Sequence, residues 1–460
     1  FLDQILPAEA VALYNGTVPV RFRGPLDPVL VERAFQEIIA RHEILRTGFI
    51  LDGEPIQLIA PAVPFSIPLV DLSHLPAELR EAKALEIAEN DAHRPFDLGS
   101  PPLLRVQLLR LADDDHVLVP TIHHIVFDAW SADVLMREFT ALYDAFRDGQ
   151  PSPLPPLRLQ YADYAIWQRQ WLQGDVLEAQ LAYWTEQLAG APALELPTNR
   201  PRPQEPTYRG RIESFRLSAE LTDQLEHLSR TADVTLFMTL LAGFQALLHR
   251  YTGQDDLVIS APVASRRCVE VEELIGFFVN SIVLRTNAAG NPTFEELLRR
   301  VRAVTIAAYA HQDVPFDRLV ETLRPERVSS HNPLFRSGFA LQNTPLERAA
   351  PRGLVVENID ARTRTTKFDL TIAMSAGPEG LVGEVEYSTD LFDTERIVEF
   401  LGLYDALLRE VVAAPSLRIL EIPLGRPADE PLPFVSGSFD FGATAQAPQQ
   451  PPDQELGNDD

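Results

Sequence analysis

The sequence has 460 residues, which exceeds the size that one hydrophobic core usually serves, so we expect two lobes. Hydrophobic residues make up 45% of the chain and charged residues 23%, the composition of a globular protein with ample core. The 40 basic and 66 acidic residues give a net charge of −26, which argues against nucleic acid as a partner because phosphate binding needs clustered Lys and Arg.

The first half of the chain combines several predicted helices with one clear strand. Residues 24–49 are predicted to form a helix, with Asp27 as its N-cap and Pro28 at its first position. Residues 116–124 are predicted to form a strand. Because Pro120 has no N–H to donate, we expect this strand at a sheet edge or at a bulge. Further helices are predicted at 132–149, 162–172 and 177–190.

The second half repeats the alternation. Residues 234–253 are apolar on nearly every side, which predicts a buried helix that ends at Gly253. Thr293 and Glu296 have the spacing of a capping box and predict the start of another helix. Strands are predicted at 256–264, 277–286 and 381–389, and a last amphipathic helix at 393–412. Interleaved helices and strands in both halves indicate an α/β fold.

Proline-rich stretches and a low-complexity tail indicate how the chain is divided. The segments 150–160 and 195–210 lack the N–H donors that a sheet requires. We place the N-terminal lobe, which carries the histidine motif described below, at 1–174 and the C-terminal lobe at 175–424. Residues 425–460 lose hydrophobic periodicity and are predicted to be a disordered acidic tail or linker rich in Pro and Gln.

The single cysteine, Cys268, permits no internal disulfide and favours a reducing compartment, so we expect a cytoplasmic protein. No cluster of residues has metal-ligand spacing, so no metal is expected. No apolar run approaches membrane-spanning length and the first residues lack the basic start of a signal peptide, so no membrane partner is expected.

The segment TIHHIVFDAWS, residues 121–131, holds the strongest candidates for catalysis. The alternation of side chains along a strand places His123 and His124 on opposite faces, so at most one of them can point into a site. The loop that follows allows Asp128 to turn back towards them. An HHxxxD pattern arises by chance, so these residues taken alone favour a structural interpretation of both histidines.

Further segments of the sequence shift this interpretation towards a catalytic role. They are RHEILRTGF (41–49), RPFDLGSPPLLR (94–105), YADYAIWQRQWL (161–172), LPTNRPRP (196–203), IGFFVNSIVLRT (275–286), HQDVPFDRLVETLRPERVSSHNPLFRSGFALQN (311–343), KFDLTIAM (367–374) and VEYSTDLFD (385–393). Together with the histidine pair they resemble the condensation domains of nonribosomal peptide synthetases, whose hallmark is HHxxxDG. The resemblance is closest to the subclass that takes an L-configured donor. The chain departs from the hallmark at Ala129, where the family usually has glycine, and a methyl group there would narrow the channel or forbid a positive φ.

The resemblance implies a pseudo-dimer of two chloramphenicol-acetyltransferase-like lobes in a V, with the active site in a central tunnel. An upstream peptidyl carrier protein would present an acyl or peptidyl thioester, and a downstream one an aminoacyl thioester. The amine would attack the thioester and leave an amide on the downstream carrier. No cofactor is implied for the chain itself, because both substrates arrive on phosphopantetheine arms of the carriers. An adjacent adenylation domain is a further candidate partner.

The resemblance also implies roles for individual residues. His124, which matches the second histidine of the motif, would face the tunnel and meet the attacking amine, whereas His123 would be a structural partner in the strand. Asp128 would pair with an arginine of the other lobe, for which Arg266 is the matching position and Arg267 the fallback. The candidates for the tunnel lining are Ala129, Trp130, Ser131 and Asn280. For Trp130 we favour a plain core position.

An imidazole suits this chemistry because an amine becomes more acidic as it attacks a thioester, and a base with a pKa of about 6.5 can accept its proton. General-base help is worth about 10² to 10⁴ in rate, and orientation of two tethered substrates can supply more. We therefore expect loss of His124 to slow turnover rather than abolish it. Two alternatives stay open: an acyltransferase of the same fold that forms an ester or acylates a free amine, and a catalytically silent platform that recruits carrier proteins.

Overall fold

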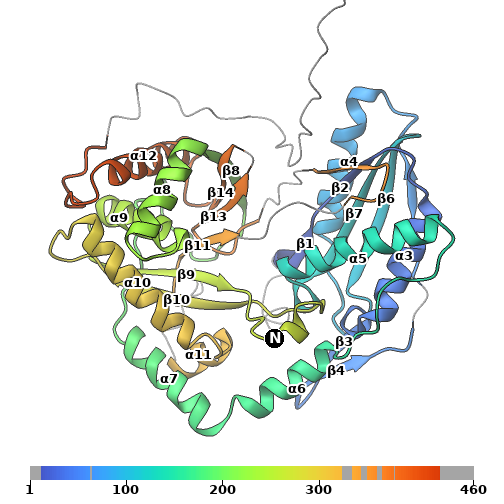
Figure 1. Ribbon diagram of the computed structural model, residues 1–460, viewed down its shortest axis with the longest axis horizontal. Helices are drawn as coiled ribbons and strands as arrows, with labels where there is room; N and C mark the ends of the chain where they lie inside the picture. The colour runs from blue at the N-terminus through green and yellow to red at the C-terminus, as the bar shows by residue number, and fades with distance from the viewer. Residues whose placement is uncertain are drawn as a thin grey trace, which may run out of the picture.

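The computed structural model describes residues 12–62, 65–323, 334–342, 350–359, 365–377 and 379–424. These residues form two lobes that lie side by side, each with a six-stranded sheet and helices packed against it (Figure 1). Helices and strands interleave in both lobes, in agreement with the α/β prediction. The predicted tail at 425–460 lies outside the described residues.

The N-terminal lobe is built on a mixed sheet with the order β12-β2-β7-β6-β5, in which β1 also pairs with β7. Its strands are β1 (Asn15–Thr17), β2 (Val20–Arg23), β5 (Leu69–Asp71), β6 (Leu104–Ala112), β7 (Asp115–His123) and β12 (Val355–Asn358). Helices α3 (Pro28–Arg41) and α5 (Ala129–Arg147) cover one face and bury Phe22, Phe35 and Phe139. Helix α4 (Ala77–Ala92) covers the other face, against Val117 and Val119.

Helix α3 begins where its sequence predicts. The Asp27 carboxylate accepts a hydrogen bond from the backbone N–H of Val29 at 2.9 Å, and Pro28 occupies the first position. The helix ends at Arg41, earlier than predicted, because His42 is extended and starts the 3₁₀ turn η2 (Glu43–Arg46). The chain then enters an exposed hairpin of β3 (Thr47–Asp52) and β4 (Glu54–Ile59).

Strand β7 lies inside its sheet, so the expectation that Pro120 marks an edge or a bulge is wrong. β7 pairs with β6 on one side and with β1 and β2 on the other. β1 ends with Thr17 opposite Thr121, and β2 begins with Val20 opposite Leu118. Pro120 therefore lies opposite the interruption between β1 and β2, where no neighbouring strand requires the N–H that proline lacks.

The C-terminal lobe holds the second sheet, with the order β10-β9-β11-β13-β14-β8. Its strands are β8 (Gly210–Ser218), β9 (Asp256–Val263), β10 (Asn280–Asn287), β11 (Ser337–Gln342), β13 (Leu370–Gly377) and β14 (Gly380–Ser388). Its helices are α8 (Ala219–Thr231), α9 (Leu236–Thr252), α10 (Phe294–Ala310), α11 (Phe316–Leu323) and α12 (Thr394–Ala413). One continuous core joins this sheet to the helices, with Phe244, Phe339 and Tyr404 among its fully buried rings.

Several local predictions for this lobe are confirmed. Every residue of α9 from Phe237 to His249 is buried, and Gly253 ends the helix with a left-handed φ of 72°. At the start of α10, Thr293 Oγ1 accepts from the Glu296 N–H at 3.2 Å, and the Glu296 carboxylate accepts from the Thr293 N–H at 3.0 Å. The predicted strands correspond to β9, β10 and β14, and the last predicted helix corresponds to α12.

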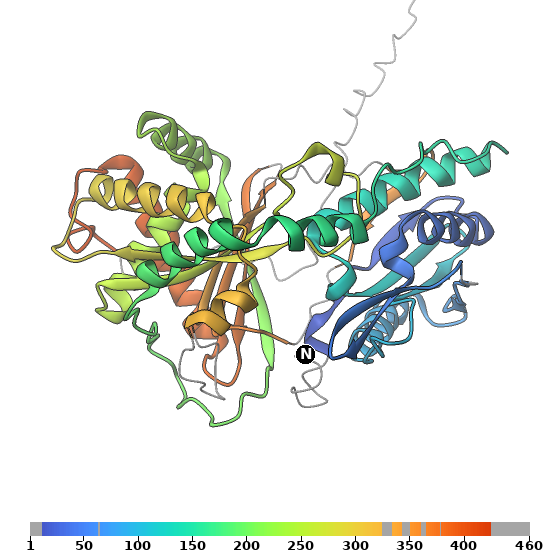
Figure 2. The ribbon, with the colours of Figure 1, turned by 90° about the horizontal axis from the view of Figure 1, so that it is seen from below.

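The lobes are joined by more than one connection. Helices α6 (Tyr161–Trp171) and α7 (Gly174–Leu188) run in series along one side of the junction (Figures 1 and 2). The segment 264–279 between β9 and β10, which includes the 3₁₀ turn η4 (Val269–Val271), crosses to the N-terminal lobe and places Ile275 in its core. Strand β12 also crosses, because it pairs with β2. The proposed boundary at 175 falls at the start of α7, yet a later part of the chain completes the first sheet.

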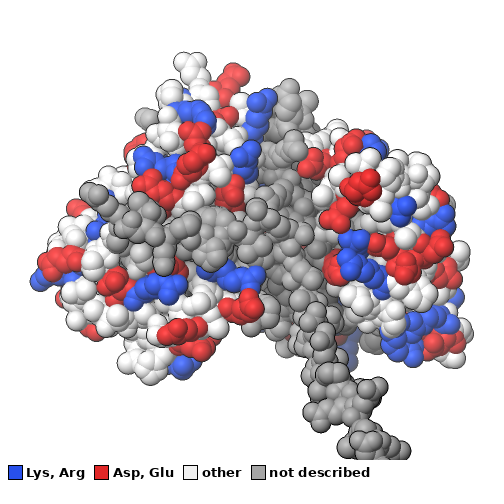
Figure 3. All heavy atoms as spheres, turned by 90° about the horizontal axis from the view of Figure 1, so that it is seen from above, with Lys and Arg blue, Asp and Glu red and all other residues white. Residues whose placement is uncertain are grey.

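Acidic and basic side chains are interspersed over the described parts of the face in Figure 3, on both lobes. Among the described residues, no single helix is both long and apolar enough to cross a membrane. Helices α8 and α9 meet the length and composition criterion only as a pair, and they are bent by 104° relative to each other.

Candidate active site

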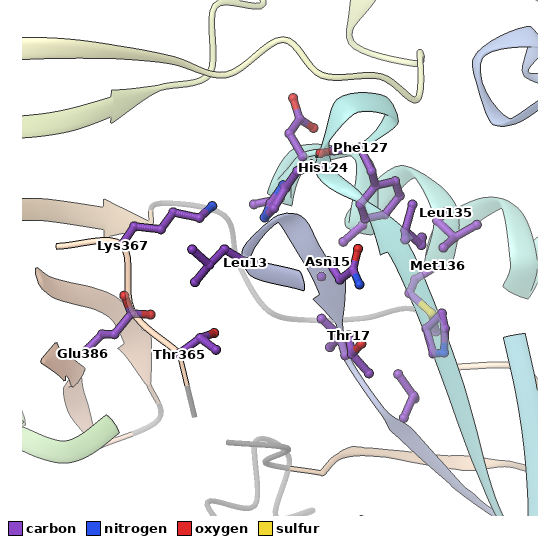
Figure 4. A pocket seen from close by; sticks show the side chains of 18 of the residues that line it. Leu13, Asn15, Thr17, His124, Phe127, Leu135, Met136, Thr365, Lys367 and Glu386 are labelled. Carbon is purple, nitrogen blue, oxygen red and sulfur yellow. Dashed lines mark hydrogen bonds between the residues drawn. The ribbon is translucent and has the colours of Figure 1, made fainter. Parts of the chain in front are cut away.

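A cavity of about 360 Å³ lies at the junction of the two lobes (Figure 4). Its N-terminal wall comes from β1, the end of β7 and the start of α5, and its C-terminal wall from residues 365–367 and β14. Apolar side chains form much of the wall: Leu13, Val18, Ile122, Leu135 and Met136. Four ionisable residues line it: His124, Asp128, Lys367 and Glu386. A polar group in this cavity is therefore partly shielded from bulk water by both lobes.

His124 begins η3 (His124–Val126), the 3₁₀ turn that follows β7, and its side chain lines the cavity. Its Nδ1 lies 3.1 Å from the carbonyl oxygen of Phe127. Because a carbonyl oxygen only accepts, Nδ1 carries the proton of the neutral ring and Nε2 keeps its lone pair. Burial, followed by the positive charge of Lys367, lowers the pKa of His124 to about 4. The ring is therefore neutral near pH 7.

His123 lies in a different environment. Its side chain is buried, and its Nδ1 accepts a hydrogen bond from the backbone N–H of Ile125 at 3.1 Å, which caps η3. The ring packs near Tyr14 and Phe96, with centroids 6.3 and 6.1 Å away. His123 is not among the residues that line the cavity. The geometry thus separates the two histidines, and the catalytic and structural roles expected for them stay predictions.

Asp128 ties the start of α5 to the other lobe. It is the N-cap of this helix, and its carboxylate accepts from the N–H and Oγ of Ser131 at 2.8 and 2.7 Å. It also accepts from the N–H of Phe278 at 3.0 Å, and Arg266 Nη2 lies 3.1 Å from its Oδ1. The Asp128 and Arg266 side chains are only 3% and 1% exposed. The pair expected from the resemblance is present in the structure.

Arg266 also organises the crossing segment 264–279. Its Nη1 donates to the carbonyl oxygens of Val271 and Leu274 at 2.6 and 2.7 Å, and its guanidinium lies 3.9 Å from the centre of the Phe278 ring. Burial lowers the pKa of Arg266, but an arginine stays charged in proteins. The fallback residue, Arg267, instead pairs with Asp313 at 2.7 Å on the surface.

Of the four residues predicted to line the tunnel, only Ala129 is in the wall of this cavity. It is the first residue of α5, so its φ is helical and the missing glycine is not required there. The other three make contacts elsewhere. Trp130 Nε1 donates to the carbonyl of Glu272 at 2.9 Å, Ser131 is fully buried beside Asp128, and the Asn280 amide donates to the carbonyls of Gln312 and Val314. Their backbone and lobe-to-lobe bonds hold these side chains away from the cavity.

Lys367 and Glu386 were not predicted as site residues. Lys367 precedes β13, inside the KFDLTIAM segment, and Glu386 lies in β14. Both reach the cavity because the C-terminal sheet faces the end of β7 across the lobe junction (Figure 4). The only sequence signal for this pair is the lysine of the KFDL segment. Its spacing from the histidine motif does not indicate that it reaches the same cavity.

The cavity combines an imidazole lone pair, a basic side chain, a carboxyl group and apolar walls. Such a site can accept a hydrogen bond from an amine, take up its proton and exclude bulk water from a reacting bond. Among the described residues, no group of three or more His, Cys, Asp or Glu side chains could hold a metal ion.

Comparison with known proteins decides the family. The family model of the condensation domain matches residues 4–430. The chain belongs to the condensation-domain family. It is 47% identical over 428 residues to a linear gramicidin synthase of Brevibacillus parabrevis, an alignment that covers 92% of this chain and 6% of that protein. It is 42% identical over 430 residues to phosphinothricin tripeptide synthetase PhsC of Streptomyces viridochromogenes, covering 92% and 39%. The chain thus spans less than two thirds of the length of these relatives.

Solved structures agree with this assignment. The X-domain from teicoplanin biosynthesis matches with a TM-score of 0.82 and 29% identity, over 90% of this chain and 95% of that chain. The four-domain nonribosomal peptide synthetase AB3403 matches with a TM-score of 0.80 and 25% identity, over 92% and 33%. The predicted family and its two-lobed chloramphenicol-acetyltransferase-like fold are confirmed. The L-donor subclass stays a prediction.

Proposed function

We propose that this chain joins a carrier-bound acyl or peptidyl thioester to the amine of a carrier-bound aminoacyl group, with His124 as the catalytic residue. The observation that carries the proposal is a neutral imidazole whose side chain lines a cavity between two lobes, with Nδ1 held by Phe127 and the Nε2 lone pair available. The names of the relatives, a linear gramicidin synthase and a tripeptide synthetase, agree with peptide-bond formation.

In the proposed reaction the neutral amine of the acceptor donates a hydrogen bond to His124 Nε2 and attacks the thioester carbonyl carbon. The C–N bond forms while the π electrons of the carbonyl move to oxygen. Collapse of the tetrahedral intermediate breaks the C–S bond, and the amine proton passes to Nε2 and then to the departing sulfur. The products are an amide on the downstream carrier and a free thiol on the upstream phosphopantetheine arm.

The test uses the whole chain with purified carrier proteins, the donor loaded on one and the acceptor on the other. His124→Ala is expected to lower the single-turnover rate by about 10² to 10⁴, with residual turnover from substrate orientation. His227→Ala, at an exposed position of α8, is the matched control and should keep the wild-type rate. Equal product formation by wild type and His124→Ala at the non-enzymatic rate, across a panel of L-configured donors, refutes the proposal.

A second candidate function is recruitment of partner proteins without catalysis. One neighbour favours it, because an X-domain was solved in complex with OxyB from teicoplanin biosynthesis and matches this chain with a TM-score of 0.81 and 28% identity. Carrier binding without turnover across the donor panel would support this function. Ester formation and acylation of a free amine are tested in the same assay by soluble hydroxyl and amine acceptors in place of the loaded carrier.

For the surroundings of the chain, we propose upstream and downstream peptidyl carrier proteins and an adjacent adenylation domain as partners, in the cytoplasm. The much greater length of the relatives, and the four domains of AB3403, support this arrangement. We also propose that the lobes comprise residues 1–174 and 175–424, except that β12 belongs to the N-terminal sheet. We further propose that the donor is L-configured.

A further inference from the structure

Lysine occurs only twice in this chain, at Lys83 and Lys367, and the remaining basic residues are arginines. Lys83 lies on the outer side of α4 and pairs with Glu86 at 2.7 Å. Lys367 instead lines the cavity from the C-terminal lobe, and its side chain extends towards the His124 side (Figure 4). A lysine ammonium is a compact charge with rotatable N–H donors, which suits close approach to a single oxygen atom.

The ammonium group of Lys367 is supported by both lobes. Its Nζ lies 4.6 Å from the centre of the Tyr14 ring, a cation–π contact with the 3₁₀ turn η1 (Ala12–Tyr14) of the N-terminal lobe. Burial lowers the pKa of Lys367, and the charge of Glu386 opposes that effect. Burial raises the pKa of Glu386, against hydrogen bonds from the Thr366 side chain and the Lys367 backbone. The Lys367 side chain therefore contacts the N-terminal lobe through Tyr14 and is exposed to the cavity.

We propose that Lys367 stabilises the oxyanion that forms on the thioester carbonyl when the acceptor amine attacks, with Tyr14 and Glu386 as positioning residues for its ammonium group. The inference rests on the proposed function, because it assigns a second polar group to the same reaction. Lys367 comes from the wall opposite His124. A carbonyl carbon held between the walls can therefore receive the amine from the His124 side while its oxygen points towards the ammonium.

The cation matches the charge that develops in the reaction. As the C–N bond forms, the carbonyl oxygen gains a negative charge, which the Lys367 ammonium meets with an N–H donor and a full positive charge. The apolar walls screen this attraction less than bulk water does. The proton lost by the amine goes to His124 Nε2 and then to sulfur, so Lys367 exchanges no proton and is unchanged at the end of the cycle.

The same cation acts on His124. After burial, Lys367 is the next cause that lowers the pKa of this ring. The other ionisable groups that act on the ring are His123, which lowers its pKa, and Asp128, which raises it. Removal of the Lys367 charge should therefore raise the pKa of His124 from about 4 towards its ordinary value of about 6.5. A residue that merely filled space would not produce this shift.

The first test compares Lys367→Met, Lys367→Arg and the control Lys83→Met in the whole chain with loaded carriers. Lys367→Met keeps much of the side-chain volume without the charge, and its single-turnover rate is expected to fall about 10²-fold, as for loss of one oxyanion donor. Lys367→Arg restores the charge and should recover part of that loss. Lys83→Met should keep the wild-type rate. A wild type that turns over, with Lys367→Met within about threefold of it, overturns the inference.

The second test needs no substrate. Titration of His124 by NMR of histidine-labelled protein should show its pKa raised in Lys367→Met and unchanged in Lys83→Met. An unchanged titration in Lys367→Met overturns the inference, because the cation would then lie too far from the reacting atoms. A wild type that forms no product refutes the proposed function, and an active wild type with an insensitive Lys367→Met variant refutes only the role of Lys367, so the two failures are distinguishable.

Discussion

Replacement of Arg266 by methionine tests how the lobes are held together. The change removes the cation from a pair in which Arg266 is 1% and Asp128 3% exposed, and it leaves the carboxylate inside the protein. The N–H and Oγ of Ser131 and the N–H of Phe278 still donate to Asp128, so part of its hydrogen bonding survives. The carbonyl oxygens of the crossing segment that Arg266 contacts lose a charged donor at the same time.

The expected magnitude follows from burial. Removal of one partner from a buried ion pair costs about 3–5 kcal/mol, because an uncompensated charge remains. The Arg302–Asp233 pair has a similar distance, 2.8 Å, but its side chains are 42% and 91% exposed. Such a surface pair is worth about 0–1 kcal/mol. Arg266→Met should therefore destabilise the protein by about 2–5 kcal/mol more than the matched control Arg302→Met.

Urea unfolding followed by tryptophan fluorescence provides the assay, and Trp130 reports on this region because its ring lies 5.8 Å from the Arg266 guanidinium. The double variant Asp128→Asn with Arg266→Met removes the stranded charge and should recover part of the loss of Arg266→Met alone. The reasoning is refuted if Arg266→Met and Arg302→Met unfold at the same urea concentration, or if the Asn replacement gives no recovery.

Two further changes test other buried contacts. The Glu138 carboxylate lies 2.9 Å from His42 Nε2; burial raises its pKa, but His42 and Arg41 outweigh that effect, so the pKa is lowered. Glu138→Gln should lower the unfolding free energy by on the order of 3 kcal/mol at pH 7. A carboxyl group whose pKa is lowered by folding stabilises the protein above the pKa of the unfolded state, about 4.3. The difference in stability between wild type and Glu138→Gln should therefore shrink as the pH falls below about 4.3. Gly276→Ala would place a Cβ against the Tyr161 ring and should cost about 1–3 kcal/mol, as measured by thermal unfolding.

The glycine change has a matched control, and each change has an outcome that would contradict it. Gly99→Ala adds the same methyl group where the nearest atom is 3.4 Å away, so its melting temperature should match the wild type, and an equal loss in both glycine variants would contradict the packing argument. For Glu138→Gln, a stability difference from wild type that stays constant between pH 7 and pH 3 would show that the charge of Glu138 contributes nothing.

The sequence predicted structure best where the cause is local. The Asp27 cap, the capping box at Thr293 and the left-handed Gly253 depend on neighbours within one helical turn, and all three are confirmed. The edge or bulge predicted from Pro120 was wrong because the position of a strand in a sheet depends on which other strands flank it. The interruption between β1 and β2 cannot be recognised from the sequence near residue 120. Helix α4 was not predicted, because its buried face is made mainly of alanines and gives only a weak hydrophobic pattern.

Only the N-terminal wall of the site could be predicted from the sequence. The histidine motif and the partner Arg266 came from the family resemblance, and the structure brings Asp128 and Arg266 together. Lys367 and Glu386 could not be found in this way, because their place opposite His124 depends on how the C-terminal sheet docks on the N-terminal lobe. Hydrophobic periodicity and motif spacing describe the order of residues along the chain, and they do not predict how two sheets pack against each other.

The exchanged strand β12 limits how this protein can be divided or recombined. β2 is hydrogen-bonded to β7 on one side and to residues 355–358 on the other, so a fragment that stops at the helices joining the lobes would expose an unpaired edge. Such a fragment is expected to aggregate through that edge. A chimera that swaps the first lobe for a relative's therefore has to import the matching four-residue strand as well, because otherwise the host's β12 must pair with a β2 to which its side chains are not fitted.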